Sequence, residues 1–268
     1  MPALLAMTPA AQAQTARPVP GGIADILLPA SSTRPEARLG DKPVLVRQEP
    51  DGWHAWVGIP LDTPPGRLEL QLGKGPEARI LPFEVQPHSY PVQRLSIKNP
   101  RLVTPNPEDE LRILADGAVL REARETFDPR REARLPLALP AQGRLSSRFG
   151  LQRFFNGQPR APHSGLDVAV PSGTPVRAPA DGVVNQVGDY YFNGLTVFVD
   201  HGQGLVSMVC HLSRSRVRPG DTVRQGDVLG DSGQSGRATG PHLHWSMYLN
   251  GTAVDPQLLL SSGPGPAR

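Results

Sequence analysis

Two histidines separated by one leucine, His242 and His244, constrain this chain more than any other feature of its sequence. In an extended strand, residues i and i+2 point to the same face, so a strand here presents both imidazoles on one surface. Imidazole is the commonest metal ligand and titrates near neutral pH. Five of the seven histidines fall between His163 and His244, a clustering that favours a chemical site over a solvated surface.

A second cluster lies upstream, where His163 and Asp167 are four residues apart. The Ser-Gly pair between them is typical of a bend, which lets both side chains converge on one ion. Taken alone, this spacing could equally be a capping or turn pair. One carboxylate and two imidazoles would fill three positions of a tetrahedron and leave the fourth for water, as in catalytic zinc sites. The only cysteine, Cys210, excludes an intrachain zinc site built from several cysteines.

The chain resembles the lysostaphin-like M23 zinc metallopeptidases, which cut peptide cross-links in bacterial cell walls. The resemblance rests on three motifs in the family's order: His163-x3-Asp167, Val209-Cys210-His211-Leu212 and His242-Leu243-His244. Residues 173–184, 217–230 and 233–242 also fit the family pattern, so the match covers about the C-terminal half. The run Phe154 to Arg160 resembles the branch found in Gram-negative bacteria. Val209 departs from the pattern, because many members carry tyrosine there.

The resemblance implies one zinc ion per chain, bound by His163, Asp167 and His244, and two catalytic histidines, His211 and His242. One histidine would accept the proton of the attacking water or orient that water. The other would stabilise the oxyanion or protonate the leaving amine. The sequence does not divide these roles between the two.

The implied substrate is peptidoglycan, through its stem peptides or cross-bridges. A Gram-negative wall favours the cross-link between D-alanine and diaminopimelate, with glycine bridges as the alternative. Two other interpretations stay open. The protein could bind the wall without hydrolysis and activate other hydrolases, or it could be a zinc carboxypeptidase that trims stem peptides. The presence of all five motif residues favours an enzyme.

Several other residues have a structural and a functional interpretation. The segments Tyr190 to Asn193 and Phe154 to Gln158 are expected in loops, which either form walls of the groove or pack as ordinary loops. His201 follows a strand and is expected to be structural. The isolated His54 and His88 are expected to be structural as well.

The composition favours short strands, because 31 prolines and 28 glycines supply frequent turn signals and aromatic residues are few. Over residues 21–92, alternating runs such as Arg67 to Leu72 predict a small β-sandwich of immunoglobulin-like type. Trp53 and Trp56 are expected to pack within it or at its edge rather than to form a sugar platform. The chain is therefore predicted to be mostly β.

One helix is expected in the connector over residues 93–136. Asn106-Pro107 followed by acidic residues predicts its start, and Phe127-Asp128-Pro129 its end. Leu111, Leu114 and Ala118 follow at helical spacing, and we expect the connector to pack between the two domains.

The peptidase domain is predicted over residues 137–262, as an antiparallel β-sheet with a groove over the metal, a fold that the resemblance implies. Alternation along its middle motif places Val209 and His211 on one face and Cys210, as a buried thiol, on the other. We expect a fragment beginning at about Leu137 to fold alone.

The two ends of the chain are predicted to lie outside these domains, as residues 1–20 and the tail 263–268. A short apolar stretch and Ala11-Gln12-Ala13 fit the end of a signal peptide, with a disordered tail as the alternative. Export to the periplasm or cell envelope is therefore expected. No apolar run approaches the ~20 residues of a membrane span. No basic run with interleaved aromatics indicates nucleic acid binding, and the net charge of +3 is small. We expect a monomer.

Overall fold

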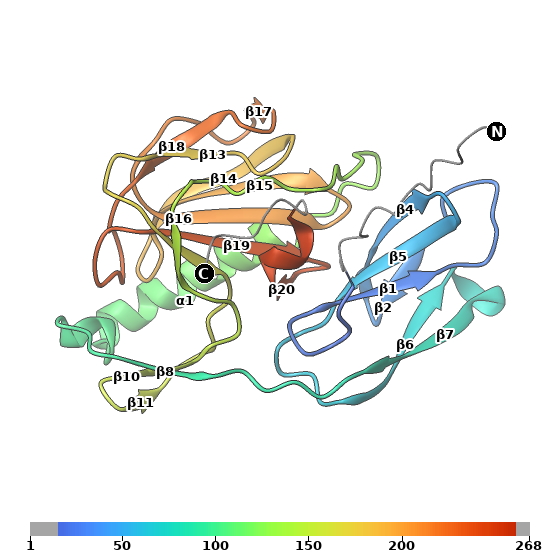
Figure 1. Cartoon of the computed structure of the whole chain (residues 1–268), viewed down its shortest axis with the longest axis horizontal. Coiled ribbons are helices and arrows are strands. Elements are labelled where there is room, and N and C mark those ends of the chain that lie inside the picture. Colours follow the sequence, from blue (N-terminus) through green and yellow to red (C-terminus); the bar gives the residue numbers. More distant parts are fainter. Residues whose placement is uncertain (1–15, 261–268) are drawn as a thin grey trace, which may run out of the picture.

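The computed structural model describes residues 16–260, which form two β-rich halves joined by a connector that carries the one α-helix of this range (Figure 1). The prediction of a mostly β chain is confirmed. The proposed signal-peptide remnant at Ala11 to Ala13 and the tail 263–268 lie outside the described residues. Within residues 16–260, no helix combines the length and the apolar character needed to cross a bilayer.

Seven short strands form the N-terminal half. They are β1 (Ile23–Leu27), β2 (Ala37–Leu39), β3 (Lys42–Pro43), β4 (Leu45–Glu49), β5 (Gly52–Gly58), β6 (Gly66–Leu72) and β7 (Arg79–Val85). Two antiparallel sheets result, in the orders β1-β5-β4 and β3-β2-β6-β7. Val46 and Ala55 from the first sheet share a buried core with Leu70 and Val85 from the second. This packing confirms the predicted β-sandwich.

The connector leaves the sandwich and runs along the C-terminal half (Figure 1). It contains the 3-10 helix η2 (Pro100–Leu102) and the strand β8 (Val92–Leu95), which pairs in parallel with β10 (Gln152–Phe155). A third short strand, β11 (Gln158–Pro159), completes this small sheet. The connector is thus part of the C-terminal half from β8 onward.

Helix α1 (Pro107–Arg124) begins where the sequence predicts. The Asn106 side chain accepts a hydrogen bond from the Asp109 amide, and Asp109 in turn accepts one from the Asn106 amide, which satisfies two free amides of the first turn. The helix ends at Arg124, slightly before the predicted Phe127, where the Thr126 hydroxyl donates to the Glu122 carbonyl.

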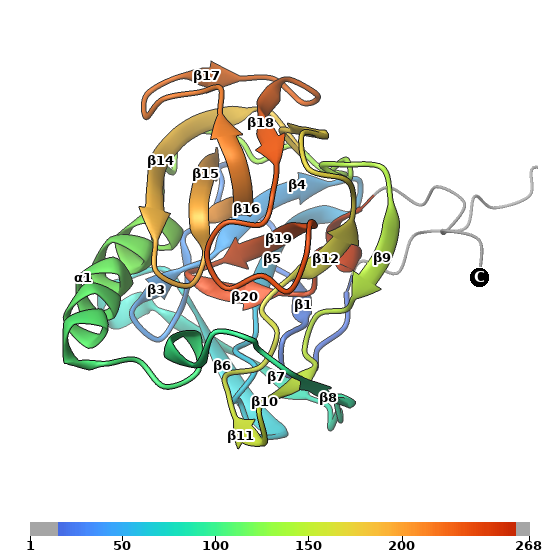
Figure 2. The same cartoon turned by 90° about the vertical axis from the view of Figure 1, so that its left-hand side faces the viewer.

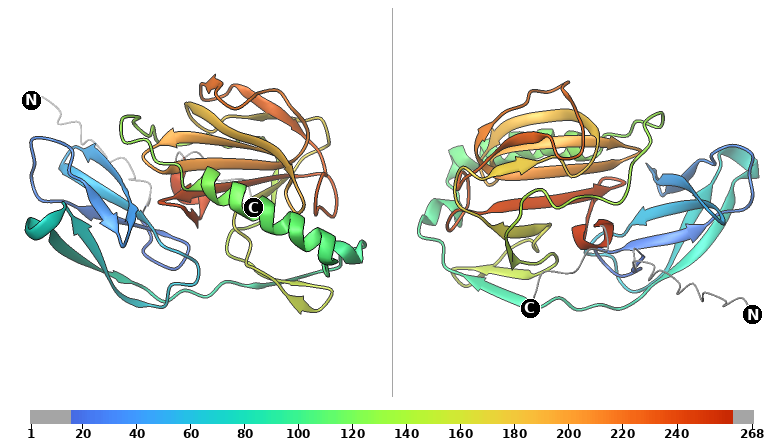
Figure 3. Two further views of the ribbon diagram at one scale, coloured as in Figure 1. Left: turned by 180° about the vertical axis from the view of Figure 1, so that it is seen from behind. Right: turned by 45° about the horizontal axis from the view of Figure 1, so that its top comes forward.

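The face that α1 buries differs from the predicted one. Leu111 and Leu114, which suggested the helix, are 70% and 72% exposed. Instead, Leu120 and Ala123 pack against a cluster on the C-terminal sheet that contains Phe198 and Tyr248. Figures 2 and 3 show the helix lying along this sheet. The C-terminal turns of α1 thus cover an apolar face of the C-terminal sheet.

The connector residues after α1 also contact the sandwich, which agrees with the expected packing between the domains. Lys42 Nζ lies 3.1 Å from Glu125 Oε1, and Arg34 donates a hydrogen bond to the Pro129 carbonyl.

The C-terminal half is a large antiparallel sheet in the order β17-β14-β15-β16-β19-β12-β9, with β13, β18 and β20 attached (Figure 2). In the described part of the chain, the sheet has ten strands and is followed by a 3-10 helix: β9 (Arg144–Ser147), β12 (Leu166–Ala169), β13 (Pro175–Arg177), β14 (Gly182–Tyr190), β15 (Gly194–Gly202), β16 (Leu205–Ser215), β17 (Thr222–Val223), β18 (Val228–Ser232), β19 (Leu243–Leu249), β20 (Thr252–Val254) and η3 (Pro256–Leu259). The central strands β15, β16 and β19 are almost wholly buried, which agrees with their apolar sequences.

The sandwich and the C-terminal sheet share one core. Ile23, Leu45 and Trp56 from the β1-β5-β4 sheet pack in the same buried cluster as Leu249 and Leu259 of the second half. This burial confirms that Trp56 has a packing role. The right panel of Figure 3 shows the two halves side by side.

Two turn residues add polar links between the halves. The Asn250 side chain accepts a hydrogen bond from the Gly58 amide at 2.6 Å and donates one to the Gly58 carbonyl at 3.1 Å. Gln203 accepts a hydrogen bond from the Val46 amide at 3.1 Å. Both side chains extend from turns in which their own residue has a positive φ.

Candidate active site

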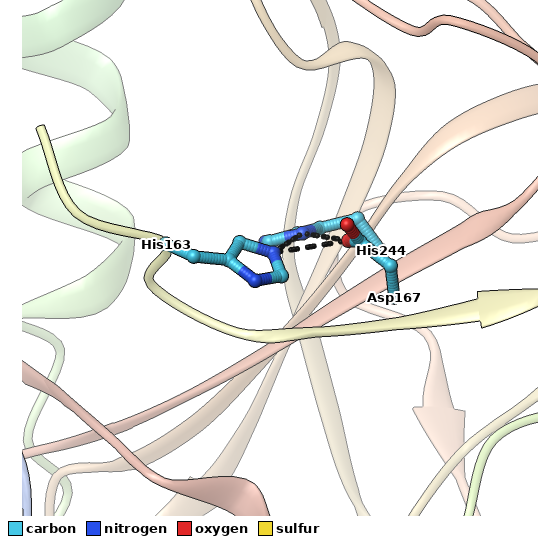
Figure 4. A group of neighbouring side chains, drawn as sticks. All are labelled: His163, Asp167 and His244. Carbon is cyan, nitrogen blue, oxygen red and sulfur yellow. Dashed lines mark hydrogen bonds and ion pairs between the residues drawn. The ribbon is translucent and has the colours of Figure 1, made fainter. Parts of the chain in front are cut away.

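Neighbouring strands bring the first and third motifs together. Strands β12 and β19 are antiparallel, with Asp167 directly opposite His244, and His163 lies in the segment just before β12. His163 Nε2 lies 3.0 Å from Asp167 Oδ1 and 3.0 Å from His244 Nδ1, and the last two atoms are 2.8 Å apart (Figure 4). Among the described residues, these three side chains form the group that can hold a metal ion.

In each of the two histidines, the ring nitrogen that faces away from Asp167 lies within hydrogen-bond distance of another group. The Nδ1–H of His163 donates to the Arg148 carbonyl at 2.7 Å, and His244 Nε2 lies 2.8 Å from the Ser246 hydroxyl. These contacts leave the lone pairs of His163 Nε2 and His244 Nδ1 facing the carboxylate. Three electron-pair donors that converge without a proton to share are a donor set for a cation.

The protonation states also suit a metal. Although burial opposes ionisation, the closely placed His163 and His244 hold the pKa of the Asp167 carboxyl well below its usual range. Burial lowers the pKa of His244 to about 4, against the opposing effect of Asp167. Arg153 Nη2 donates to the second carboxylate oxygen, Asp167 Oδ2, at 3.1 Å. The site therefore offers an ionised carboxylate and a neutral imidazole at pH 7, the forms that bind metals.

His211 and His242 lie beside this group, with their ring centroids 4.8 Å apart. The Nδ1–H of His211 donates to the Ser235 carbonyl at 2.8 Å, and that of His242 donates to the Gly240 carbonyl at 2.8 Å. Nε2 is thus the basic atom of each ring, and that of His242 lies 3.9 Å from Asp167 Oδ1. Burial lowers the pKa of His211 to about 3, so this ring is neutral at pH 7.

The predicted alternation along β16 is wrong at this point. Val209 is buried in the main core, whereas Cys210 and His211 both line the groove. His211 has φ 62°, in the left-handed region, and the pairing of β16 with β15 shifts register between Val209 and Leu212. The irregularity turns the imidazole to the same side as its neighbour. Cys210 is buried, as predicted, and burial raises the pKa of its thiol far above the usual value.

A groove with a volume of about 430 Å³ contains the site and extends under α1. Phe155 and Phe192 belong to its walls, so parts of both predicted segments line it. Phe155 is the last residue of strand β10 and does not lie in the expected loop, because β10 pairs with β8 and β11. Tyr191 does not line it and instead donates a hydrogen bond from its hydroxyl to Asp109 of α1. The connector brings Leu95 and Ile97 into the groove from outside the motifs, so no sequence signal marked them. Arg237 lies within the matching run 233–242, but nothing in the sequence distinguished it as a groove residue.

The other histidines lie away from this groove. His201 is fully buried, and its ring nitrogens lie 2.8 Å from the Asp181 carbonyl and 2.8 Å from the Ser207 hydroxyl. His54 bonds to Asp25 in the sandwich. His88 stacks edge-on against Tyr90. None of the three is a lining residue of the groove.

Family models match both halves of the chain. Residues 161–256 match Peptidase family M23, and residues 16–88 match the Peptidase family M23 N-terminal domain. A crystal structure from Pseudomonas aeruginosa, described as an M23 peptidase, is 42% identical and superposes with a TM-score of 0.79. That match covers 93% of this chain and 98% of the other.

Two curated relatives match the C-terminal half. Peptidoglycan DD-endopeptidase ShyC of Vibrio cholerae is 40% identical over 116 residues, which are 42% of this chain and 27% of the relative. DD-carboxypeptidase/endopeptidase Mpg of Neisseria meningitidis is 42% identical over 113 residues, which are 42% of this chain and 26% of the relative. The matched region thus spans about a quarter of the length of each relative.

Proposed function

Because this chain belongs to peptidase family M23, we propose that it is a zinc-dependent endopeptidase that hydrolyses peptide cross-links of bacterial peptidoglycan. The observation that carries the proposal is the convergence of His163 Nε2, Asp167 Oδ1 and His244 Nδ1 at the wall of one groove, which Asp167 and His244 line. The similarity to ShyC and Mpg supports a bond between two D-configured centres, such as the D-alanyl–diaminopimelate link. The proposed place of action is the periplasm or cell envelope.

His163, Asp167 and His244 would hold one zinc ion per chain, with two nitrogens and one oxygen as ligands. When bound, zinc lowers the pKa of its water towards neutrality and polarises the scissile carbonyl. Arg153 keeps Asp167 Oδ2 engaged, so Oδ1 is the oxygen that faces the histidines. The chain thus supplies three ligands and leaves a position for water.

We assign His211 and His242 the proton transfers of the reaction. Each ring has its Nδ1–H fixed on a backbone carbonyl and carries its lone pair on Nε2. One ring accepts a proton as water forms the new C–O bond. The proton taken from the water is then passed on, and the other ring delivers it from Nε2 to the nitrogen as the C–N bond breaks, so the amine leaves neutral. Either ring can take either part.

A carboxypeptidase is the second candidate, because Mpg is named for both activities. Digestion of purified wall sacculi by the zinc-loaded full chain distinguishes the possibilities. An endopeptidase converts cross-linked dimers to monomers, and a carboxypeptidase only shortens stem peptides. The His242→Ala variant serves as the inactive control. If the full chain released no new product and only stimulated other hydrolases, the enzyme proposal would be wrong and the activator alternative correct.

A further inference from the structure

The groove carries more positive charge than its own acidic residues can balance. Arg124, Arg153 and Arg237 line it, and among its described lining residues Asp167 is the only carboxylate. Asp167 already accepts a hydrogen bond from Arg153 at Oδ2, and its Oδ1 lies within 3.0 Å of ring nitrogens of His163 and His244. The remaining positive charge therefore faces the space in which the proposed substrate would lie.

Arg237, in the loop between β18 and β19, packs over two aromatic rings. Its guanidinium carbon lies 4.1 Å from the ring centroid of Phe192 and 4.8 Å from that of Phe155. Both rings line the groove, and Phe155 also contacts Arg153, with the guanidinium carbon 5.9 Å from the ring centroid. Stacking of this kind fixes the plane of a guanidinium and leaves the N–H groups at its edge free to bind a ligand.

The hydrogen bonds of Arg237 leave most of its donors without a partner. A guanidinium has five N–H donors, and Arg237 uses Nη1 in one bond, to the Leu102 carbonyl at 3.3 Å. Within residues 16–260 it makes no ion pair, whereas Arg153 pairs with Asp167 and Arg216 with Asp231. Burial, together with the nearby charges of Arg153 and Arg160, lowers the pKa of Arg237 to about 10, so it stays charged at pH 7. Among the described residues, Arg237 has no fully buried nitrogen that lacks a partner, so its unused donors are accessible to a ligand.

We propose that Arg237 binds a carboxylate of the peptide substrate, and that the groove thereby selects cross-links that carry a free carboxylate beside the scissile amide. This inference rests on the proposed function. A planar guanidinium matches a carboxylate through two parallel hydrogen bonds. Diaminopimelate carries a free carboxylate next to the nitrogen of its cross-link, whereas a glycine bridge carries none. The proposal therefore favours the first substrate over the second.

The competing interpretation is that Arg237 only stabilises the position of the connector, through its hydrogen bond to the Leu102 carbonyl. Arg160 offers a matched control, because its Nη2 donates to the neighbouring Val103 carbonyl at 2.6 Å but Arg160 does not line the groove. If holding the connector were the whole role of Arg237, removal of either arginine would have similar consequences.

Binding of two peptides tests the proposal. Both are D-alanyl–diaminopimelate cross-linked peptides, identical except that the carboxylate beside the scissile amide is free in one and amidated in the other. Calorimetry on the zinc-loaded full chain carrying His242→Ala measures affinity without turnover. We expect the free acid to bind about 10-fold or more tightly than the amide, in line with hydrogen bonds to a charged group. Adding Arg237→Gln should abolish this preference, Arg237→Lys should restore part of it, and Arg160→Gln should leave it intact.

The same peptides give a kinetic readout with His242 intact. Arg237→Gln should raise KM for the free acid far more than it raises KM for the amide. Equal affinity of the His242→Ala chain for both peptides would overturn the proposal, and so would an equal loss for both on Arg237→Gln. If the wild type cleaves neither peptide but the carboxylate preference in binding persists and depends on Arg237, the carboxylate site stands and the proposed endopeptidase activity fails.

Discussion

At the scale of single residues, the candidate metal site depends on hydrogen bonds to the ring nitrogens that face away from the proposed metal ion. The Ser246 hydroxyl holds His244 Nε2 and so turns Nδ1 towards Asp167. We expect Ser246→Ala to weaken zinc binding by roughly 10-fold, a typical effect of an outer hydrogen bond, and His244→Ala to abolish it. Competition with a chelator measures both. Ser213→Ala is the control, since that hydroxyl bonds a carbonyl outside the site. Unchanged affinity in Ser246→Ala would show that the hydroxyl does not orient the ring.

The two remaining motif histidines should separate catalysis from metal binding. His211→Ala and His242→Ala each remove a basic Nε2 but none of the three converging ligand atoms. We expect near-normal zinc content and a loss of hydrolysis of ~100-fold or more, the typical contribution of a positioned acid or base. Elemental analysis and a soluble muropeptide assay measure the two quantities. Near-normal turnover of either variant would exclude that histidine from the proton transfers.

The motifs point to the residues that converge but not to those that support them. His163, Asp167 and His244 stand in patterns that a single sequence reveals, and the fold places them together. Arg153 and Ser246 have no comparable signal, because an arginine or serine near an apolar run is ordinary until the fold shows what it contacts. The role proposed for Arg237 likewise depends on its packing over Phe155 and Phe192, which only the fold reveals.

At the scale of elements, the alternation of apolar and polar residues predicts strands well. It does not predict where the backbone of a strand becomes irregular. The strict pattern of Arg67 to Leu72 and the capping signal at Asn106 correspond to an observed strand and helix start. The left-handed φ of His211 breaks the alternation of β16, and no local sequence feature marks a histidine for that conformation. The buried side of α1 also could not be predicted, because the apolar surface that it covers comes from strands far along the chain.

The buried His201 ties β15 to β16 and should make stability depend on pH. Burial lowers its pKa to about 4 from an ordinary 6.5. The unfolded chain therefore takes up the proton first, so the free energy of unfolding should fall as the pH drops from about 6.5 towards 4. The slope from this group approaches ~1.4 kcal/mol per pH unit. His201→Gln, which does not titrate, should show a smaller decrease in urea unfolding over this range. Equal pH slopes for the two proteins would contradict this origin.

At the scale of the whole molecule, the connector belongs structurally to the C-terminal half. β8 pairs with β10, and Leu120 and Ala123 of α1 cover Phe198 and Tyr248. A fragment beginning at Leu137, which the sequence suggested as self-contained, would lose both contacts. The domain ranges predicted from sequence therefore remain a hypothesis that truncation can test.

Two truncations give that test. We expect a fragment beginning at Pro87 to fold, bind zinc and cleave soluble muropeptides, because it keeps β8, α1 and every residue proposed for the site. A fragment beginning at Leu137 should unfold at a temperature lower by roughly 5 °C or more, since losing the burial of a leucine removes ~2 kcal/mol and exposes the apolar face of the sheet. Both fragments lose the same contacts with the sandwich, so their difference reports the connector alone. Equal melting temperatures and equal zinc content would mean that β8 and α1 do not stabilise the C-terminal half, and that its boundary lies at Leu137 as the sequence first indicated.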